Sequence, residues 1–217
     1  MHVACAVSSV PAAWVAQCRP GGRIVLPYTP GYGYGHRVRL EVVGDGTAVG
    51  RFVGAAGYMM MRSHRHPIGA LSSFLHDEEA AVRTVTRMDP RTLTRGGPGA
   101  DLAISTMVPG VRRFVGGDED GDSGEETLWL LETRPDARTA GSWAVAEYEP
   151  GRDEYQVDQY GPRRLCDDVT AAYTRWVGWG MPDRDRFGLT VGPDGQQVWL
   201  DSPGNVVEPI PPDLQSW

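Results

Sequence analysis

Lysine is missing from this sequence, and all 21 basic residues are arginines. A GC-rich genome accounts for that bias, but its consequence is chemical. Enzymes that form a Schiff base and P-loop NTPases both need a lysine, so both classes are excluded. The 28 acidic residues outnumber the arginines and leave a net charge of −7. A general nucleic-acid binder carries a basic face, so this balance argues against nucleic acid as a partner.

Cysteines are few and long apolar runs are missing. The three cysteines, Cys5, Cys18 and Cys166, lie far apart and form no CxxC pair, so neither a zinc site nor a disulfide framework is indicated. No apolar run approaches the roughly 18 residues that cross a bilayer, and no signal peptide opens the chain. We therefore expect a cytoplasmic protein without a membrane partner. Its 217 residues suffice for one large domain or two small ones.

The first 65 residues show the pattern of an α/β sheet. Residues 2–7 are an apolar run with almost no alternation, which is typical of a strand buried on both faces. Ser8 and Ser9 can cap a helix at residues 12–18, and Pro11 fits its first turn. A second apolar strand at residues 23–27 completes a βαβ unit with a right-handed crossover.

Two more strands are predicted at residues 37–42 and 48–53. Gly44-Asp45-Gly46 lies between them and is a strong hairpin turn signal. The chain therefore opens with the end of an α/β sheet that finishes in antiparallel strands.

Residues 6–27 carry a family resemblance. They comprise a strand that ends in small residues, a proline, a helix that ends in Gln17, and a Gly21-Gly22 turn into an apolar strand that ends in Pro27. This segment resembles the second half of a protein-L-isoaspartate O-methyltransferase. Residues 50–62 resemble the closing strands of that family, with Met60-Met61 in place of the usual Pro-Leu. The resemblance covers about residues 2–65.

A narrower resemblance is to actinobacterial members with an extra C-terminal domain, some of which accompany ATP-grasp or lanthipeptide enzymes in the biosynthesis of modified peptides. It rests on residues 134–138, 161–164 and 187–201.

The resemblance implies a fold class and a division of the chain. We expect an α/β fold in which residues 1–65 form the C-terminal part of a Rossmann-like methyltransferase sheet. A smaller α+β accessory domain follows at residues 100–217. Residues 66–99 would connect them through a helix at residues 71–88 and a glycine-rich break at residues 96–99.

The resemblance also implies a reaction. Members of the family bind S-adenosyl-L-methionine and methylate aspartyl or isoaspartyl carboxylates of a protein or peptide, and the ester can then close to a succinimide. Such folds hold the cofactor at a glycine-rich strand-to-helix turn, which we expect to lie before Met1. The resemblance places substrate-binding residues at Ser8, Ser9, Pro11, Met61 and Arg62. No catalytic, cofactor-binding or metal-binding residue is assigned in this chain.

Three readings of the function remain open. The chain is part of a carboxyl O-methyltransferase, one half of a split enzyme whose N-terminal half is supplied in trans, or a non-catalytic peptide-binding module. A protein or precursor peptide is the expected partner in each case. Activity of the chain alone is not expected, because the cofactor turn is missing. The acceptor peptide, and the choice between repair and peptide tailoring, cannot be read from the sequence.

Three motifs suggest other sites without meeting their requirements. Residues 31–35 match GxGxG but lead into a strand pattern instead of a helix, so we expect a flexible aromatic loop. Asp118, Asp120 and Asp122 have EF-hand spacing, but the required glycine and glutamate are replaced, so a solvated loop is expected. His64, His66 and His76 show no pattern that supports a metal site.

The rest of the chain has clear local patterns. Strands are expected at residues 102–108, 127–132, 142–148 and 155–160, the last two as an antiparallel pair. Residues 162–179 predict a helix with one apolar stripe. A hairpin is expected at residues 187–200 around Gly192-Pro193-Asp194-Gly195.

Overall fold

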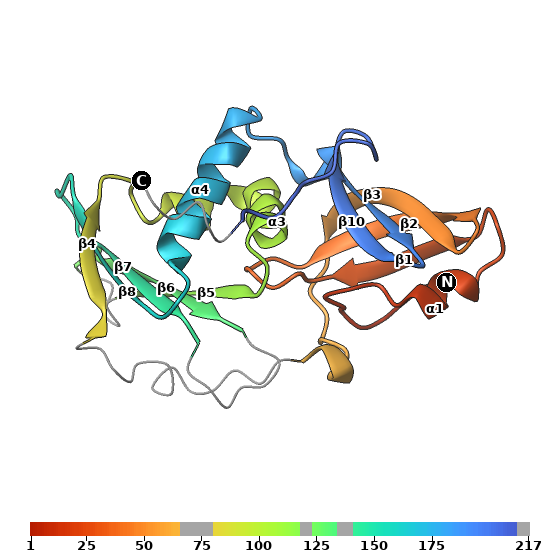
Figure 1. The fold of residues 1–217 in the computed structure, drawn as a ribbon, viewed down its shortest axis with the longest axis horizontal. Coiled ribbons are helices and arrows are strands. Elements are labelled where there is room, and N and C mark those ends of the chain that lie inside the picture. Colours follow the sequence, from red (N-terminus) through yellow and green to blue (C-terminus); the bar gives the residue numbers. More distant parts are fainter. Residues whose placement is uncertain (66–79, 118–122, 134–140, 212–217) are drawn as a thin grey trace.

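Two antiparallel sheets dominate the protein. The computed structural model describes residues 1–65, 80–117, 123–133 and 141–211. Within these ranges there are two five-stranded sheets, with strand orders β1-β2-β3-β9-β10 and β4-β8-β7-β6-β5. Figure 1 shows the sheets at opposite ends of the molecule with helices between them. The expected α/β fold with a Rossmann-like parallel sheet is therefore wrong, and the described protein is mainly β.

The first sheet contains the predicted N-terminal hairpin. Its strands are β1 (Arg23–Tyr28), β2 (His36–Gly44), β3 (Thr47–Ala55), β9 (Phe187–Gly192) and β10 (Gly195–Leu200). Along β2 the side chains alternate between buried and exposed, as a strand with one buried face requires. The β2–β3 turn places Asp45 at φ 52° and Gly46 at φ 71°. Two consecutive left-handed residues make the turn that matches strand twist, which confirms the hairpin.

Residues 2–7 do not form the buried parallel strand that the expected α/β fold requires. They lie beside β1 in a parallel sense but form only isolated bridges, His2 with Val25 and Val7 with Tyr28. The next three strands, β1 to β3, are joined by connections too short for a crossover, so they pair antiparallel, and β9 adds to β3 in antiparallel register as well. Helix α1 (Ala12–Ala16) is present as predicted. Its N-cap is Pro11 and no side chain caps it, so the predicted capping by Ser8 and Ser9 is wrong.

The C-terminal hairpin is confirmed as a hairpin, but it belongs to the first sheet. β9 pairs with β10, and β9 also pairs with β3 in antiparallel register, with Arg51 opposite Gly188. Residues that we expected in the accessory region therefore complete the sheet built by residues 23–55. The domain boundaries themselves stay a prediction.

The second sheet consists of β4 (Val82–Thr86), β5 (Val111–Gly117), β6 (Glu126–Glu132), β7 (Trp143–Tyr148) and β8 (Tyr155–Tyr160). The predicted pairing of residues 142–148 with 155–160 is confirmed as β7–β8. The helix predicted at residues 71–88 falls partly outside the described residues. Where it is described it is wrong, because β4 pairs with β8 there.

Helices α3 (Gly97–Met107) and α4 (Leu165–Gly178) lie between the sheets (Figure 1). A short helix α2 (Thr92–Arg95) precedes α3, and 3-10 helices η1 (Arg62–His64) and η4 (Arg184–Arg186) occur in connections. The predicted helix at residues 162–179 is confirmed by α4, which packs on β6, β7 and β8. The predicted strand at residues 102–108 is wrong, because α3 contains most of it.

One hydrophobic core runs through both sheets. Buried side chains of β1, β2, α3, α4, β6 and β9 belong to a single cluster. In α3 the side chains of Leu102, Ile104 and Met107 are fully buried. Eight of the eleven residues of α3 are buried, Asp101 and Ser105 among them, so the core surrounds most of this helix, and α3 packs against α4. In the described part of the chain no helix is long and apolar enough to cross a membrane.

Candidate functional site

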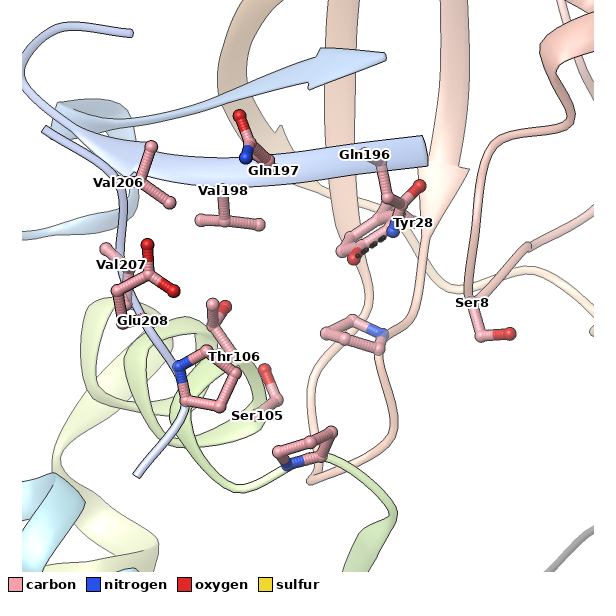
Figure 2. Close-up of a pocket in the computed structure, with 13 residues that line it drawn as sticks. Ser8, Tyr28, Ser105, Thr106, Gln196, Gln197, Val198, Val206, Val207 and Glu208 are labelled. Carbon is pink, nitrogen blue, oxygen red and sulfur yellow. Dashed lines mark hydrogen bonds between the residues drawn. The ribbon is translucent and has the colours of Figure 1, made fainter. Parts of the chain in front are cut away.

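A cavity of about 360 Å³ lies where β10, the end of β1 and the last turn of α3 meet (Figure 2). This volume falls within the range of small-ligand pockets, roughly 300–1,000 Å³. The lining residues come from four separate parts of the chain: Ser8, Tyr28, Pro30, Ser105, Thr106, Pro109, Gln196, Gln197, Val198, Val206, Val207, Glu208 and Pro209. Because the first sheet and α3 share one core, the walls are held by packing.

Gln196 links the two edges of the first sheet. Its Nε2 donates to the hydroxyl of Tyr28 at 3.0 Å, and its Oε1 accepts from the backbone N–H of Val10 at 2.8 Å. Tyr28 ends β1 and Gln196 lies on β10, the opposite edge strand. The sheet is therefore curled far enough for its edges to meet through side chains, and the cavity opens beside this contact (Figure 2).

The hydroxyl of Tyr28 is a neutral donor in the cavity wall. Burial raises the pKa of Tyr28 to about 12, more than the Gln196 hydrogen bond lowers it. The phenol therefore keeps its proton at neutral pH. The amide of Gln196 occupies one acceptor position of the oxygen, and no described residue accepts the hydroxyl hydrogen. That hydrogen is available to an acceptor in the cavity.

The main chain of β10 is unpaired at Gln196. Further along the strand, the carbonyl of Val198 accepts from Val207 N at 2.9 Å and Leu200 N donates to the carbonyl of Asn205 at 2.9 Å. Main-chain groups alternate between the two sides of an antiparallel strand, so those of Gln196 point to the same outer side. In the described ranges no main-chain group pairs with them there. We call this position the free edge of β10.

Most of the remaining polar side chains of the wall can accept hydrogen bonds, and the amide of Gln197 can both accept and donate. The hydroxyls of Ser105 and Thr106 both donate to the carbonyl of Leu102, at 3.1 and 2.7 Å, which leaves their oxygen lone pairs toward the cavity. Glu208 is exposed at the margin and has no ion-pair partner among the described residues. It is the one charged side chain among the lining residues that the structure describes. The wall therefore favours a ligand rich in hydrogen-bond donors or carrying a positive charge.

Of the predicted substrate-binding residues, Ser8 alone is among those that line the cavity. It lies at the margin, and its hydroxyl is directed away from the other lining side chains (Figure 2). Its backbone N–H donates to Nδ1 of His64 at 3.2 Å, and its Oγ lies 3.3 Å from the same nitrogen. Ser8 and His64 thus form a pair beside the cavity.

The other predicted site residues lie near Ser8 but outside the cavity wall. The backbone N–H of Met61 donates to the carbonyl of Ala6 at 2.8 Å, which brings the segment that holds Met61 and Arg62 against the segment before Ser8. Met61 packs against the core, while Ser9 and Arg62 are exposed and Pro11 is half-buried. The structure therefore joins two predicted parts of the site, and their binding of substrate stays a prediction.

Sequence reasoning missed Tyr28, Gln196 and Glu208. Tyr28 and Gln196 are 168 positions apart, so no local pattern connects them. A signal was available only in the glutamine pair at residues 196–197, two polar residues at the start of an otherwise apolar strand.

The GxGxG loop at residues 31–35 is a structural joint. Tyr32 is buried and donates from its hydroxyl to the carbonyl of Leu93 at 3.1 Å, so the loop is anchored where a flexible loop was expected. The backbone N–H of Tyr34 donates to Oδ1 of Asp101 at 3.0 Å. A side chain at Gly33 would lie within 2.7 Å of Asp101 and Arg113, which explains the glycine there. The loop leads into β2 and not into a helix.

Buried charges surround Asp101 at this joint. Oδ2 of Asp101 lies 3.3 Å from Nε2 of His36, and Oδ1 lies 3.8 Å from Nη2 of Arg113. Arg113 also donates to the carbonyl of Thr94 at 2.8 Å and lies over the ring of Tyr32. These contacts tie the first sheet and α3 to β5 of the second sheet, so their role is to join the two sheets.

The acidic run and the histidines that suggest a metal site lie mostly outside the described residues. The acidic run at residues 118–122, and two of the three histidines, His66 and His76, lie outside them. Within the described ranges, no group of three or more potential metal ligands is present.

No protein-family model matches this chain, and no curated protein matches it in sequence. A solved protein-L-isoaspartate O-methyltransferase is similar to 92% of this chain at 14% sequence identity, with a TM-score of 0.35. The chain spans 53% of the length of that structure. The protein therefore has a remote structural likeness to a protein-L-isoaspartate O-methyltransferase, and at this level the likeness assigns no cofactor site and no functional residue.

Proposed function

We propose that the protein is a peptide-binding module that holds an extended peptide along the free edge of β10. The observation that carries this proposal is the unpaired main chain of Gln196 in the wall of a cavity. An exposed strand edge is a template for another extended chain, which gains affinity from main-chain hydrogen bonds and specificity from side-chain pockets.

The protein already uses the same edge in this way. Residues 205–207 lie along the outer side of β10 and pair with Val198 and Leu200. The unpaired main chain of Gln196 lies further along the same side of β10, so a bound peptide would pair with β10 next to residues 205–207. The Tyr28 hydroxyl, whose hydrogen is not accepted within the described residues, would donate to a peptide carbonyl.

The cavity wall selects the side chain. Ser105, Thr106 and Glu208 offer oxygen acceptors, and an arginine or lysine side chain offers several donors with a positive charge. A peptide carboxylate would face Glu208 with no cation in the wall to offset the repulsion. The preferred peptide therefore places a cationic residue here, and an acidic residue at the same position weakens binding.

The test uses fluorescein-labelled hexapeptides of alanine and glycine with a single arginine, glutamine or aspartate, measured by fluorescence anisotropy. We expect affinity to fall in the order arginine, glutamine, aspartate. Glu208→Gln removes the difference between arginine and glutamine, whereas Glu147→Gln, on the distant strand β7, leaves it unchanged. Failure of all three peptides to bind, or equal binding of all three, overturns the proposal.

The role of the strand edge has its own variant pair. Gln196→Ala removes the side chain and keeps the backbone N–H, whereas Gln196→Pro also removes the N–H. Because that N–H points away from β9, proline breaks no bond of the sheet. One lost main-chain hydrogen bond of about 0.5–1.5 kcal/mol predicts about two- to tenfold weaker binding of Gln196→Pro than of Gln196→Ala. Equal affinity of the two variants rules out edge pairing.

As a second candidate, we propose that the protein contributes acceptor binding to a carboxyl O-methyltransferase whose S-adenosyl-L-methionine-binding half is a separate chain. The observation that favours it is the contact between the Ser8 segment and the Met61–Arg62 segment, which the sequence resemblance placed in one substrate site. The test is transfer of tritiated methyl from S-adenosyl-L-methionine to an isoaspartyl hexapeptide. Base-labile methyl that appears only when a co-purifying chain is present supports this candidate, and none in either sample overturns it.

A further inference from the structure

We propose that His64 is a positioning residue for the cavity and that its protonation weakens peptide binding, so that the protein releases its peptide as the pH falls. This inference rests on the proposed function and adds a means of regulating it. The observation that carries it is a pair of contacts at one ring nitrogen. Nδ1 of His64 accepts from the backbone N–H of Ser8 at 3.2 Å and lies 3.3 Å from the Ser8 hydroxyl oxygen, and Ser8 lies at the cavity margin (Figure 2).

The backbone contact determines which protonation state of His64 fits the structure. A backbone N–H can only donate, so the Nδ1 that accepts from Ser8 carries no proton. Protonation of the ring places a hydrogen on both nitrogens, and Nδ1 then becomes a donor. The N–H of Ser8 loses its acceptor, and of the two Ser8 groups only the hydroxyl oxygen can accept from Nδ1. Protonation therefore exchanges a main-chain contact for a side-chain contact.

Ser8 belongs to the segment that holds Gln196 in place. The backbone N–H of Val10 donates to Oε1 of Gln196 at 2.8 Å, and Nε2 of Gln196 donates to the Tyr28 hydroxyl at 3.0 Å. A displacement of Ser8 is therefore passed through Val10 to Gln196. In this way the contact at His64 helps to fix the hydroxyl that we expect to bind a peptide carbonyl.

The segment that carries His64 is anchored to the same part of the chain. The backbone N–H of Met61 donates to the carbonyl of Ala6 at 2.8 Å, and the backbone N–H of His64 donates to the carbonyl of Met61 at 2.9 Å. Main-chain bonds therefore hold the two segments together next to the contact, and the ring and Ser8 stay opposite each other when the proton is gained.

Charge acts in the same direction as the lost contact. Arg62 and Arg65 are exposed on either side of His64 in the sequence. The facing segment, residues 5–10, has one titratable side chain, the free thiol of Cys5, and neither segment contains a carboxylate. Protonation of His64 therefore adds a positive charge that neither segment offsets, and a cationic peptide beside it is repelled.

The first test measures the affinity of the arginine hexapeptide between about pH 8 and pH 5.5, the range in which histidine side chains change charge. A rhodamine label replaces fluorescein, whose emission itself depends on pH. Loss of one hydrogen bond predicts affinity that falls about two- to tenfold towards the lower pH. His64→Gln places a non-titrating amide opposite Ser8 and removes this pH dependence, whereas His2→Gln, at an exposed histidine, retains it.

A second test needs no peptide. In ¹H–¹⁵N spectra of the free protein, we expect the backbone amide signals of Ser8 and Val10 to shift together over the same pH range, because the first amide loses its acceptor and the second belongs to the segment that it holds. In His64→Gln neither signal titrates. This readout reports the positioning role directly and does not depend on the peptide chosen.

The outcomes separate the two proposals. Arginine-peptide affinity that stays constant or rises as the pH falls overturns this inference and leaves the proposed function standing. Affinity that still falls in His64→Gln also overturns it, because another group then titrates. Amide signals of Ser8 and Val10 that do not titrate overturn the positioning role, whether or not peptides bind. Failure of every peptide to bind at either pH overturns the proposed function, and with it the regulation of binding, even where the amides titrate.

Discussion

Replacing Asp101 by alanine removes the acceptor around which the joint between the two sheets is built. Asp101 is 2% exposed and accepts from the backbone N–H of Tyr34, while His36 and Arg113 face its two oxygens. In Asp101→Ala these groups stay buried without their acceptor. Nδ1 of His36 has no hydrogen-bond partner in the described structure. In Asp101→Ala the imidazole therefore has no hydrogen bond at either ring nitrogen.

The magnitude follows from the geometry. Removing one partner of a buried ion pair costs about 3–5 kcal/mol, since the other charge is left without compensation. Arg113 keeps its bond to the carbonyl of Thr94, so we expect the lower end, about 3 kcal/mol. For a protein of this size that corresponds to a fall of roughly 6–12 °C in Tm. Asp101→Asn keeps an acceptor for Tyr34 and costs less.

Urea unfolding followed by tryptophan fluorescence measures the effect, with thermal unfolding as a second readout. The matched control is Asp158→Ala. Asp158 pairs with Arg83 at 2.8 Å, but the Arg83 side chain is 70% exposed, and such pairs contribute about 0–1 kcal/mol. A loss below about 1 kcal/mol in Asp101→Ala, or a loss equal to that of the control, would refute the argument that this buried cluster joins the sheets.

Two further predictions concern packing and pH. A Cβ at Gly188 would overlap the ring of Trp199 on the neighbouring strand, so Gly188→Ala should lower the free energy of unfolding by about 1–3 kcal/mol. The control is Gly192→Ala, where the atom nearest to the added Cβ is 3.7 Å away, and we expect a smaller loss in the same urea titration. Burial raises the pKa of Tyr28 from 10.0 to about 12 in the folded protein. As the pH rises, the unfolded chain therefore loses the phenol proton before the folded protein does. The free energy of unfolding is unaffected below pH 10 and falls by up to about 2–3 kcal/mol between pH 10 and 12. Tyr28→Phe should flatten that part of the pH profile of unfolding, and an unchanged slope would contradict the assignment.

Local patterns predicted the elements whose structure is decided locally. Asp45 and Gly46 specify the β2–β3 turn, because few residues adopt positive φ without strain. The helix at residues 162–179 has one apolar stripe, and the structure buries most of that stripe against the second sheet and α3. In both cases the physical cause lies within a few residues, so the sequence alone was sufficient.

The wrong predictions share a physical cause. Residues 102–108 are an apolar run whose length and composition suit a buried strand or a buried helix equally, and the surrounding core selects the helix. Residues 82–86 fall within the helix predicted at residues 71–88, but pairing with β8 makes them a strand. In each case the deciding partner lies outside the segment. The parallel direction predicted for residues 2–7 is confirmed, but their pairing with β1 is limited to isolated bridges.

Most residues that line the cavity could not be predicted from the sequence. The family resemblance places Ser8 in the substrate site, and in the structure Ser8 lies at the cavity margin. The groups that give the cavity its chemistry come from the first sheet, from α3 and from the segment after β10. Tyr28 and Gln196 meet only because β9 joins a strand formed more than 130 positions earlier, with Arg51 opposite Gly188. That pairing also leaves the edge at Gln196 unoccupied. The feature on which the proposed function depends is therefore a consequence of tertiary structure, and a variant that alters the edge tests it more directly than any change at the residues that the sequence singled out.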